Sequence, residues 1–146
     1  IQFTMSHDDG KKVDDISNAD VILLGVSRTS KTPTSIYLAN RGYKTINIPL
    51  VLEQKIPEGL TTNKKACIIG LVADPERLAD IRRNRVAIMK DHKLKEYTDI
   101  DYIKKEVADS KALFKKNNWP MIDVTRRSVE ETAASILKII EIKKNK

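Results

Sequence analysis

The sequence has one cysteine, few aromatic residues and no long uninterrupted apolar run. A single thiol, Cys67, cannot build a disulfide framework, so we expect a reducing cytoplasm and a buried structural thiol. No apolar run approaches the roughly 20 residues that a membrane-spanning helix needs. The chain has only two Phe, four Tyr and one Trp, which are few for an aromatic surface on which single-stranded bases stack. These shortages argue against membrane-spanning and nucleic-acid-stacking proteins.

Positive charge is in excess. Lys and Arg number 27 against 20 Asp and Glu, which gives a formal net charge of +7. Such a balance suits nucleic acids, anionic membranes or phosphorylated ligands. Because aromatic residues are scarce, we favour phosphate ligands, with neither a nucleic-acid nor a membrane partner.

The length of 146 residues fits one domain with a single core. Residues 1–5 read as a strand, and the chain does not open with a basic segment followed by an apolar one, so we expect no signal peptide. This abrupt start predicts that residues 1–146 are a fragment of a longer protein.

Short apolar runs alternate with stretches of helical period. Strands are expected at residues 20–24, 44–50, 66–72 and 121–124, and helices at 34–40, from 74, at 99–117 and from 128. Gly42, Asp74 and Ser128 are the expected caps, the last within a capping box that ends at Glu131. Residues 51–65 read as a long loop, and residues 90–98 as a polar stretch. The pattern predicts an α/β doubly wound domain, with a mostly parallel sheet and a P-loop-like strand–loop–helix.

Residues 25–32 carry the central motif. A phosphate loop reads G-x-x-x-x-G-K-[ST] and lies between a buried strand and a helix. The spacing here matches, with Ser30 in place of the second glycine, and we expect Lys31 to reach the terminal phosphate and Thr32 to place a hydroxyl on Mg²⁺. Arg28 could brace the transferring group. The expected phosphate-binding residues are Gly25, Val26, Ser27, Arg28, Thr29, Ser30, Lys31 and Thr32.

The serine at position 30 leaves two interpretations open. Where a phosphate loop turns with positive φ, a residue other than glycine costs about 1–2 kcal/mol. Either the loop conformation differs or the strain is tolerated. The alternative to a phosphate loop is a Ser- and Thr-rich turn that caps a helix.

Carboxylates follow the first expected strand. His7, Asp8 and Asp9 precede Gly10, and such a group could bind Mg²⁺, contact phosphate or take a proton from an attacking hydroxyl. A plain Asp-Asp-Gly turn is the alternative.

Arginines recur near expected strand ends. Arg82 and Arg85 continue the buried stripe of the helix after Asp74, where they either extend outward or face an anion. Arg126 and Arg127 follow the last strand. Because ligands of an open α/β sheet gather beyond the carboxyl ends of the strands, these four and Arg28 could face one crevice and bind a phosphate or a phosphorylated protein.

Four segments together resemble the regulatory proteins of pyruvate, phosphate dikinase, whose sister group regulates phosphoenolpyruvate synthase. They are HDDG at residues 7–10, GVSRTSKTPTS at 25–35, DPERL at 74–78, and WP through DVT at 119–125. The resemblance covers essentially the whole chain and corresponds to the C-terminal part of the family, as one nucleotide-binding phosphotransferase domain. Ser30 is an accepted variant in that family.

The resemblance implies a bifunctional enzyme. One activity is an ADP-dependent kinase that phosphorylates a threonine beside the catalytic histidine of the dikinase and inactivates it. The other is a phosphorylase, in which inorganic phosphate removes that phosphoryl group and pyrophosphate is released. Lys31, Thr32 and the loop amides would hold ADP or the phosphates, and Asp8 or Asp9 would serve Mg²⁺ or the threonine proton.

Two other functions stay open on the residues alone. One is a P-loop nucleoside or small-molecule kinase, and the other is a nucleotide-sensing module without chemistry. The sequence also leaves open the choice between dikinase and synthase as target, and whether the protein forms a homodimer.

Overall fold

A computed structural model describes residues 19–26, 29, 31–50, 66–89 and 99–144, without the side chains of 85–89 and 144. The expected first strand, His7, Asp8 and Asp9 lie outside the described residues. The same is true of the loop at 51–65 and the stretch at 90–98. Within the phosphate-loop motif, the residues outside the description are Ser27, Arg28 and Ser30.

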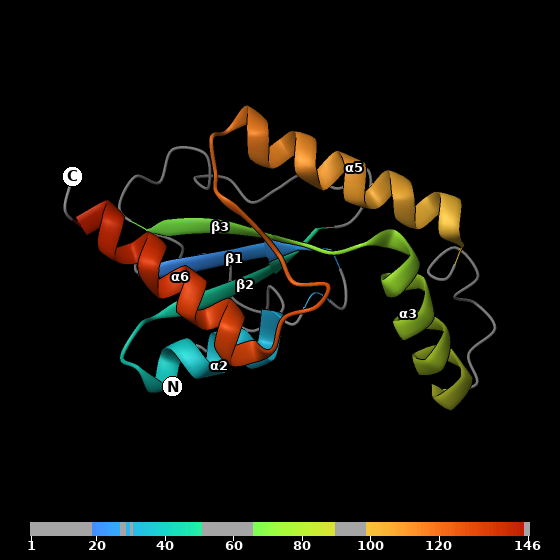
Figure 1. Cartoon of the computed structure of the whole chain (residues 1–146), viewed down its shortest axis with the longest axis horizontal. Coiled ribbons are helices and arrows are strands. Elements are labelled where there is room, and N and C mark those ends of the chain that lie inside the picture. Colours follow the sequence, from blue (N-terminus) through green and yellow to red (C-terminus); the bar gives the residue numbers. More distant parts are fainter. Residues whose placement is uncertain (1–18, 27–28, 30, 51–65, 90–98, 145–146) are drawn as a thin grey trace.

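Four parallel strands form one sheet (Figure 1). The strands are β1 (Val21–Gly25), β2 (Thr45–Pro49), β3 (Cys67–Val72) and β4 (Met121–Asp123), in the order β2-β1-β3-β4. The long apolar runs form the two central strands, as expected for strands covered on both faces. The parallel sheet is confirmed, and so are the four predicted strands that fall within the described residues.

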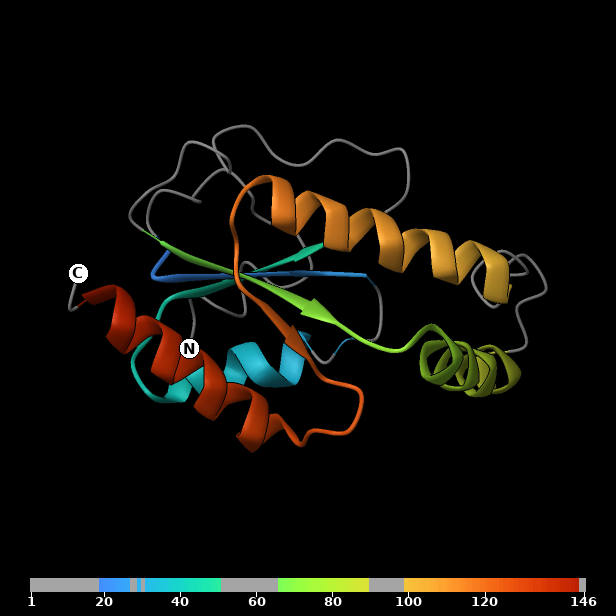
Figure 2. The same ribbon diagram turned by 45° about the horizontal axis from the view of Figure 1, so that its top comes forward.

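Helices cover both faces of this sheet (Figure 2). Helices α2 (Lys31–Asn40) and α6 (Val129–Lys144) lie against one face, and α5 (Ile100–Lys116) lies against the other. Helix α3 (Pro75–Met89) extends beyond the carboxyl end of β3 and packs on α5. This arrangement confirms the doubly wound α/β fold.

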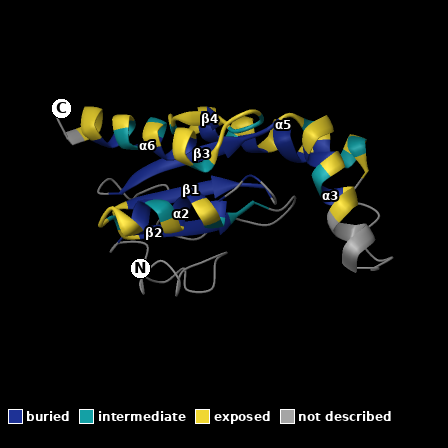
Figure 3. Cartoon of the chain, turned by 60° about the horizontal axis from the view of Figure 1, so that its bottom comes forward, coloured by how far each residue is buried: buried dark blue, intermediate teal, exposed yellow. Residues whose placement is uncertain are grey.

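The alternation of side chains along β1 separates two apolar clusters. Ile22 and Leu24 pack with Phe114 of α5, while Val21 and Leu23 pack with residues of α2 and α6 such as Leu38. Successive residues of a strand point to opposite faces, so a continuous apolar run fills both layers. Figure 3 shows the strands as buried and the helices with exposed outer surfaces.

Helix α5 approaches the sheet closely at Gly70. A Cβ atom at this position would lie 2.4 Å from the Phe114 ring, which is closer than atoms in contact can come. The glycine therefore sets the distance between α5 and β3. Cys67, at the start of the same strand, is buried as predicted, and burial raises the pKa of its thiol.

The predicted caps are largely confirmed. Gly42 ends α2 with a φ of 92°, and its N–H donates to the Ala39 carbonyl at 3.0 Å. The Glu131 N–H donates to Ser128 Oγ at 3.1 Å, as a cap of α6 requires. Glu131 does not complete the box as expected, because its carboxylate accepts the Ser128 hydroxyl at 3.3 Å.

One helix boundary was predicted wrongly. Helix α2 begins at Lys31 rather than at Thr34. The predicted start leaves Pro33 outside the helix, but proline is tolerated in a first turn, where N–H groups have no intrahelical acceptor. Lys31 and Thr32 are therefore helical residues, and the helix sets the directions in which their side chains leave the backbone.

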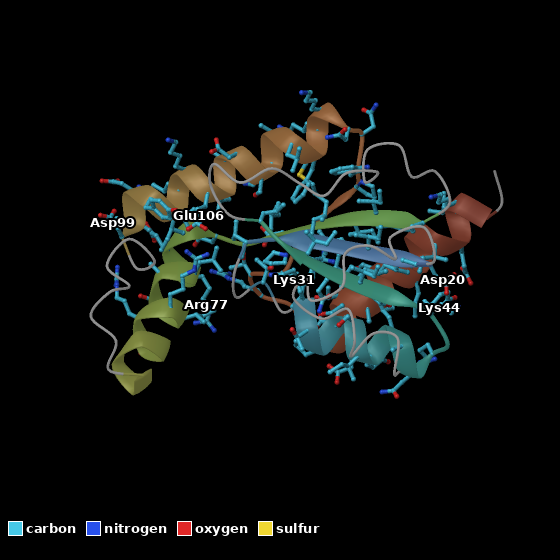
Figure 4. All side chains as sticks on the ribbon, turned by 180° about the vertical axis from the view of Figure 1, so that it is seen from behind. Asp20, Lys31, Lys44, Arg77, Asp99 and Glu106 are labelled. Carbon is cyan, nitrogen blue, oxygen red and sulfur yellow. The ribbon has the colours of Figure 1, made fainter. Side chains whose placement is uncertain are left out.

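Different side chains lie at the two ends of the sheet. At the amino end, the Asp20 carboxylate accepts the Lys44 backbone N–H at 2.8 Å, and Lys143 Nζ donates to the Ala66 carbonyl at 2.6 Å. Figure 4 shows Asp20 and Lys44 at the opposite end from Lys31 and Arg77. Among the described helices, none is long and apolar enough to cross a membrane.

Candidate functional site

The motif begins with a turn that only glycine fits. Gly25 is the last residue of β1, and a Cβ atom there would lie 2.7 Å from Thr29 Oγ1 and 2.9 Å from the Leu71 carbonyl oxygen. The chain after the strand therefore folds back closely on Gly25 and on the neighbouring strand β3. This close approach explains the first glycine of the motif.

Lys31 directs its ammonium into this turn. The side chain is buried, with 5% exposed, and Nζ donates to the Val26 carbonyl at 2.9 Å and to Thr29 Oγ1 at 3.4 Å. Thr29 is fully buried and donates its own hydroxyl to the same carbonyl at 2.9 Å. A cation thus sits at the positive end of α2, where an anion would be stabilised by both.

The first turn of α2 rests on polar contacts that we did not predict. The Ser35 hydroxyl donates to the Thr32 carbonyl at 2.8 Å, and Asn47 Nδ2 of β2 donates to Ser35 Oγ at 3.0 Å. Ser35 and Asn47 are buried, and Thr32 is half-buried. An asparagine between Ile46 and Ile48 in β2 was the available signal, because a buried amide requires a partner.

A polar groove lies beside the loop, at the carboxyl ends of β3 and β4. Its volume is about 480 Å³. Val26 of the loop packs with Ala73 and Leu78, which border the start of α3, so the loop and the groove are neighbours. The residues that line the groove are Asp74, Glu76, Arg77, Asp80, Thr125 and Arg126.

Thr125 joins the two strand ends at this groove. Its hydroxyl donates to the Asp123 carboxylate and accepts the Asp74 backbone N–H at 2.8 Å. Burial alone would raise the pKa of Asp123. The hydrogen bonds from Thr125 and the charges of Lys111 and Arg127 outweigh burial, and the pKa lies below its ordinary value of 3.8. Asp123 is therefore an anion that orients Thr125.

The predicted arginines lie in different surroundings. Arg82 is fully buried between α3 and α5, and its Nη1 donates to Glu106 Oε1 at 2.6 Å (Glu106 is labelled in Figure 4). Arg126 lines the groove, whereas Arg127 is exposed and donates to Ser135 Oγ at 2.8 Å. The side chains of Arg28 and Arg85 are not among those that the structure describes. The phosphate-binding role of each arginine stays a prediction.

Oxygen ligands for a metal ion are limited in the described part. Within it, no group of three or more His, Cys, Asp and Glu side chains is arranged around a common point. Of the expected ligands, Thr32 lies partly exposed in the first turn of α2, and Asp8 lies outside the description. Mg²⁺ is commonly bound through one or two protein oxygens together with phosphate oxygens and water, so the threonine hydroxyl fits it.

The described residues form a doubly wound α/β protein with a buried lysine in the strand–turn–helix at the carboxyl edge of its parallel sheet. Residues 1–137 match the model of the kinase/pyrophosphorylase family, and the chain belongs to that family. The predicted resemblance is thereby confirmed.

Curated relatives agree with this assignment. A protein of Pelagibacter ubique (strain HTCC1062) is 64% identical over 146 residues, which cover 99% of this chain and 53% of that protein. Proteins of Sinorhizobium medicae (strain WSM419) and Erythrobacter litoralis (strain HTCC2594) are 54% and 52% identical. Their alignments each cover 95% of this chain, and 51% and 50% of those proteins. All three are provisionally named pyruvate, phosphate dikinase regulatory protein. The chain spans about half the length of these relatives.

Proposed function

We propose that this chain is the nucleotide-binding, catalytic part of a bifunctional enzyme that acts on pyruvate, phosphate dikinase. In this proposal it is an ADP-dependent serine/threonine kinase and a phosphate-dependent, pyrophosphate-forming phosphorylase. The observation that carries the proposal is the buried Lys31 ammonium inside the turn between β1 and α2. Membership of the kinase/pyrophosphorylase family and the names of the relatives support the reaction and the target.

The kinase direction is a single displacement. The threonine oxygen of the target bonds to the terminal phosphorus of ADP, the bond from that phosphorus to the bridging oxygen breaks, and AMP leaves. The threonine proton goes to a carboxylate, for which Asp8 or Asp9 is the candidate. Lys31 and the amides at the start of α2 offset the charge of the phosphoryl oxygens, so catalysis is mainly positioning and electrostatic stabilisation.

The phosphorylase direction uses the same groups. An oxygen of inorganic phosphate bonds to the phosphorus of phosphothreonine, the bond from phosphorus to the threonine oxygen breaks, and pyrophosphate leaves. The threonine oxygen regains a proton from the carboxylic acid. Both directions place a diphosphate in the loop, which is why one loop serves two reactions. Bound Mg²⁺ would neutralise part of that charge, with Thr32 and Asp8 as its expected protein ligands.

The groove beside the loop is the expected position for the threonine-bearing segment of the target. It lies beyond the carboxyl ends of β3 and β4, where ligands of open α/β sheets bind, and Arg126 supplies a donor for a phosphate oxygen.

The decisive variant is Lys31→Ala in the full-length protein. We expect it to abolish both phosphorylation of the dikinase with ADP and pyrophosphate release from the phosphorylated dikinase, because it removes the buried cation. The matched control is Lys138→Ala, an exposed lysine on α6 far along the chain. Near-normal activity of Lys31→Ala in either direction would refute the loop assignment.

The same assay separates the other candidate functions. Preference for ATP and a small-molecule acceptor would identify a nucleoside or small-molecule kinase. Nucleotide binding without transfer to any acceptor would identify a sensing module. Labelled ADP with Mg²⁺ and both candidate target enzymes, the dikinase and the synthase, distinguishes these outcomes in one experiment.

A further inference from the structure

The buried side of α2 changes character along its length. Its first half buries Lys31, Thr34 and Ser35, whereas its second half buries Leu38 and Ala39. Apolar packing on the sheet therefore holds only the second half. The first half, which carries Lys31 and Thr32, must be positioned by polar contacts.

Asn47 provides such a contact from the neighbouring strand. It pairs with Leu23 in the sheet and is only 1% exposed, on the face that α2 covers. Its amide Nδ2 donates to Ser35 Oγ at 3.0 Å. The Ser35 hydroxyl in turn donates its one proton to the Thr32 carbonyl at 2.8 Å. The result is a directional chain of two hydrogen bonds from β2 to the first turn of α2. The hydrogen bonds of such a chain polarise and strengthen one another where water is excluded.

We infer that Asn47 is a positioning residue of the phosphate-transfer site, acting through Ser35 to fix the rotation of the first turn of α2. This inference rests on the proposed function. The Thr32 carbonyl that receives the chain belongs to the residue whose hydroxyl is expected to bind Mg²⁺, one residue after the buried lysine. Small errors in the placement of such groups cost large factors in rate, because transfer depends on alignment.

The test uses Asn47→Leu, Ser35→Ala and the double variant, each in the full-length protein. Leucine has the same branched shape as asparagine and suits the apolar surroundings, but its two methyl groups are larger, so the melting temperature of each variant is measured beside its activity. We expect kcat for dikinase phosphorylation to fall by roughly tenfold to a hundredfold, with KM for the dikinase changed less than about twofold. Because both residues act through one chain, the double variant should lose no more than either single variant.

Thr45→Val is the matched control. Thr45 is fully buried on the same face of the same strand, and its hydroxyl donates to the Tyr43 carbonyl at 3.3 Å. We expect this variant to keep kcat. If Asn47→Leu does not fold, Ser35→Ala removes only one oxygen from the same chain and carries the same test.

Three outcomes would overturn the inference. They are an unchanged kcat in both single variants, losses that multiply in the double variant, and an equal loss in Thr45→Val. Lys31→Ala is measured in parallel. If that variant is inactive while Asn47→Leu and Ser35→Ala are normal, only the positioning role fails. If Lys31→Ala is active, the proposed function itself fails.

Discussion

At the scale of single residues, Thr34 is unusual among the buried polar groups of α2. Its side chain is fully buried, and its hydroxyl has no hydrogen-bond partner among the residues that the structure describes. Removing a hydroxyl from water without a new partner costs about 1–3 kcal/mol. The residue therefore weakens the folded state in the absence of ligand.

We expect Thr34→Val to raise the free energy of unfolding by about 1 kcal/mol, since valine has the same shape without the unsatisfied group. Denaturant unfolding in the absence of nucleotide measures this difference. Thr45→Val is the comparison, because its hydroxyl has an acceptor and its loss should lower stability by about 1 kcal/mol. A lower stability for Thr34→Val would mean that its hydroxyl does make a stabilising contact.

Sequence reasoning reached some residues of the site and missed others. The turn that holds Gly25 and Lys31 was predictable because a local motif of fixed spacing specifies it, whereas the phosphate-binding role of both residues stays a prediction. Asn47 and Ser35 were not predictable, since their contact joins a strand to a helix and depends on which face of β2 meets α2. Arg82 was placed on a buried stripe correctly, but its partner Glu106 is 24 residues away and nothing in the sequence pairs them.

At the scale of elements, α3 and α5 are joined by that buried ion pair. Arg82 has no exposed surface and Glu106 is only 8% exposed. A buried charge that loses its partner typically costs about 3–5 kcal/mol. The pair therefore stabilises the position of α3, and with it the wall of the groove.

We expect Arg82→Met to lower the free energy of unfolding by about 3–5 kcal/mol, because it leaves the Glu106 carboxylate buried without its partner. Combining it with Glu106→Leu should restore much of the loss, since neither charge is then buried. Thermal unfolding of the two variants measures the difference. An exposed pair, Arg83 with Asp80, is the control, and Arg83→Ala should change stability little. Equal effects at the two pairs would contradict this view.

The elements themselves were largely predictable. Apolar runs and caps identified all four described strands, and the helices α5 and α6 with their buried residues, because local periodicity reports burial. The start of α2 was missed, since Pro33 can either precede a helix or lie in its first turn. The order of the strands depends on contacts between distant segments, and no local pattern determines it.

At the scale of the whole molecule, the described residues that we propose for chemistry, Lys31, Thr32 and Arg126, lie at one end of the sheet. The four described strands are parallel, so the loop after β1, the start of α3 and the segment after β4 come together there. Arg126 is the groove arginine that follows the last strand, and we expect it to bind a phosphate or the target protein.

We expect Arg126→Ala to raise KM for the dikinase or for inorganic phosphate by roughly tenfold to a hundredfold, since a hydrogen bond to a charged group contributes about 1.5–3 kcal/mol. Steady-state kinetics in both directions measures this. Arg41→Ala, at an exposed arginine after α2, is the control and should leave both constants unchanged. If the constants of Arg126→Ala also stay unchanged, Arg126 has no part in binding.

The hydrogen bonds of Asp20 and Lys143 lie at the other end of the strands, apart from the loop and the groove. In the proposed transferase, the groove that faces the acceptor can therefore change without rebuilding the scaffold. Directed evolution towards a new target protein should therefore concentrate diversity on the segments around residues 74–80 and 125–126. Libraries confined to those positions should retain more folded members than libraries of equal size spread along the strands.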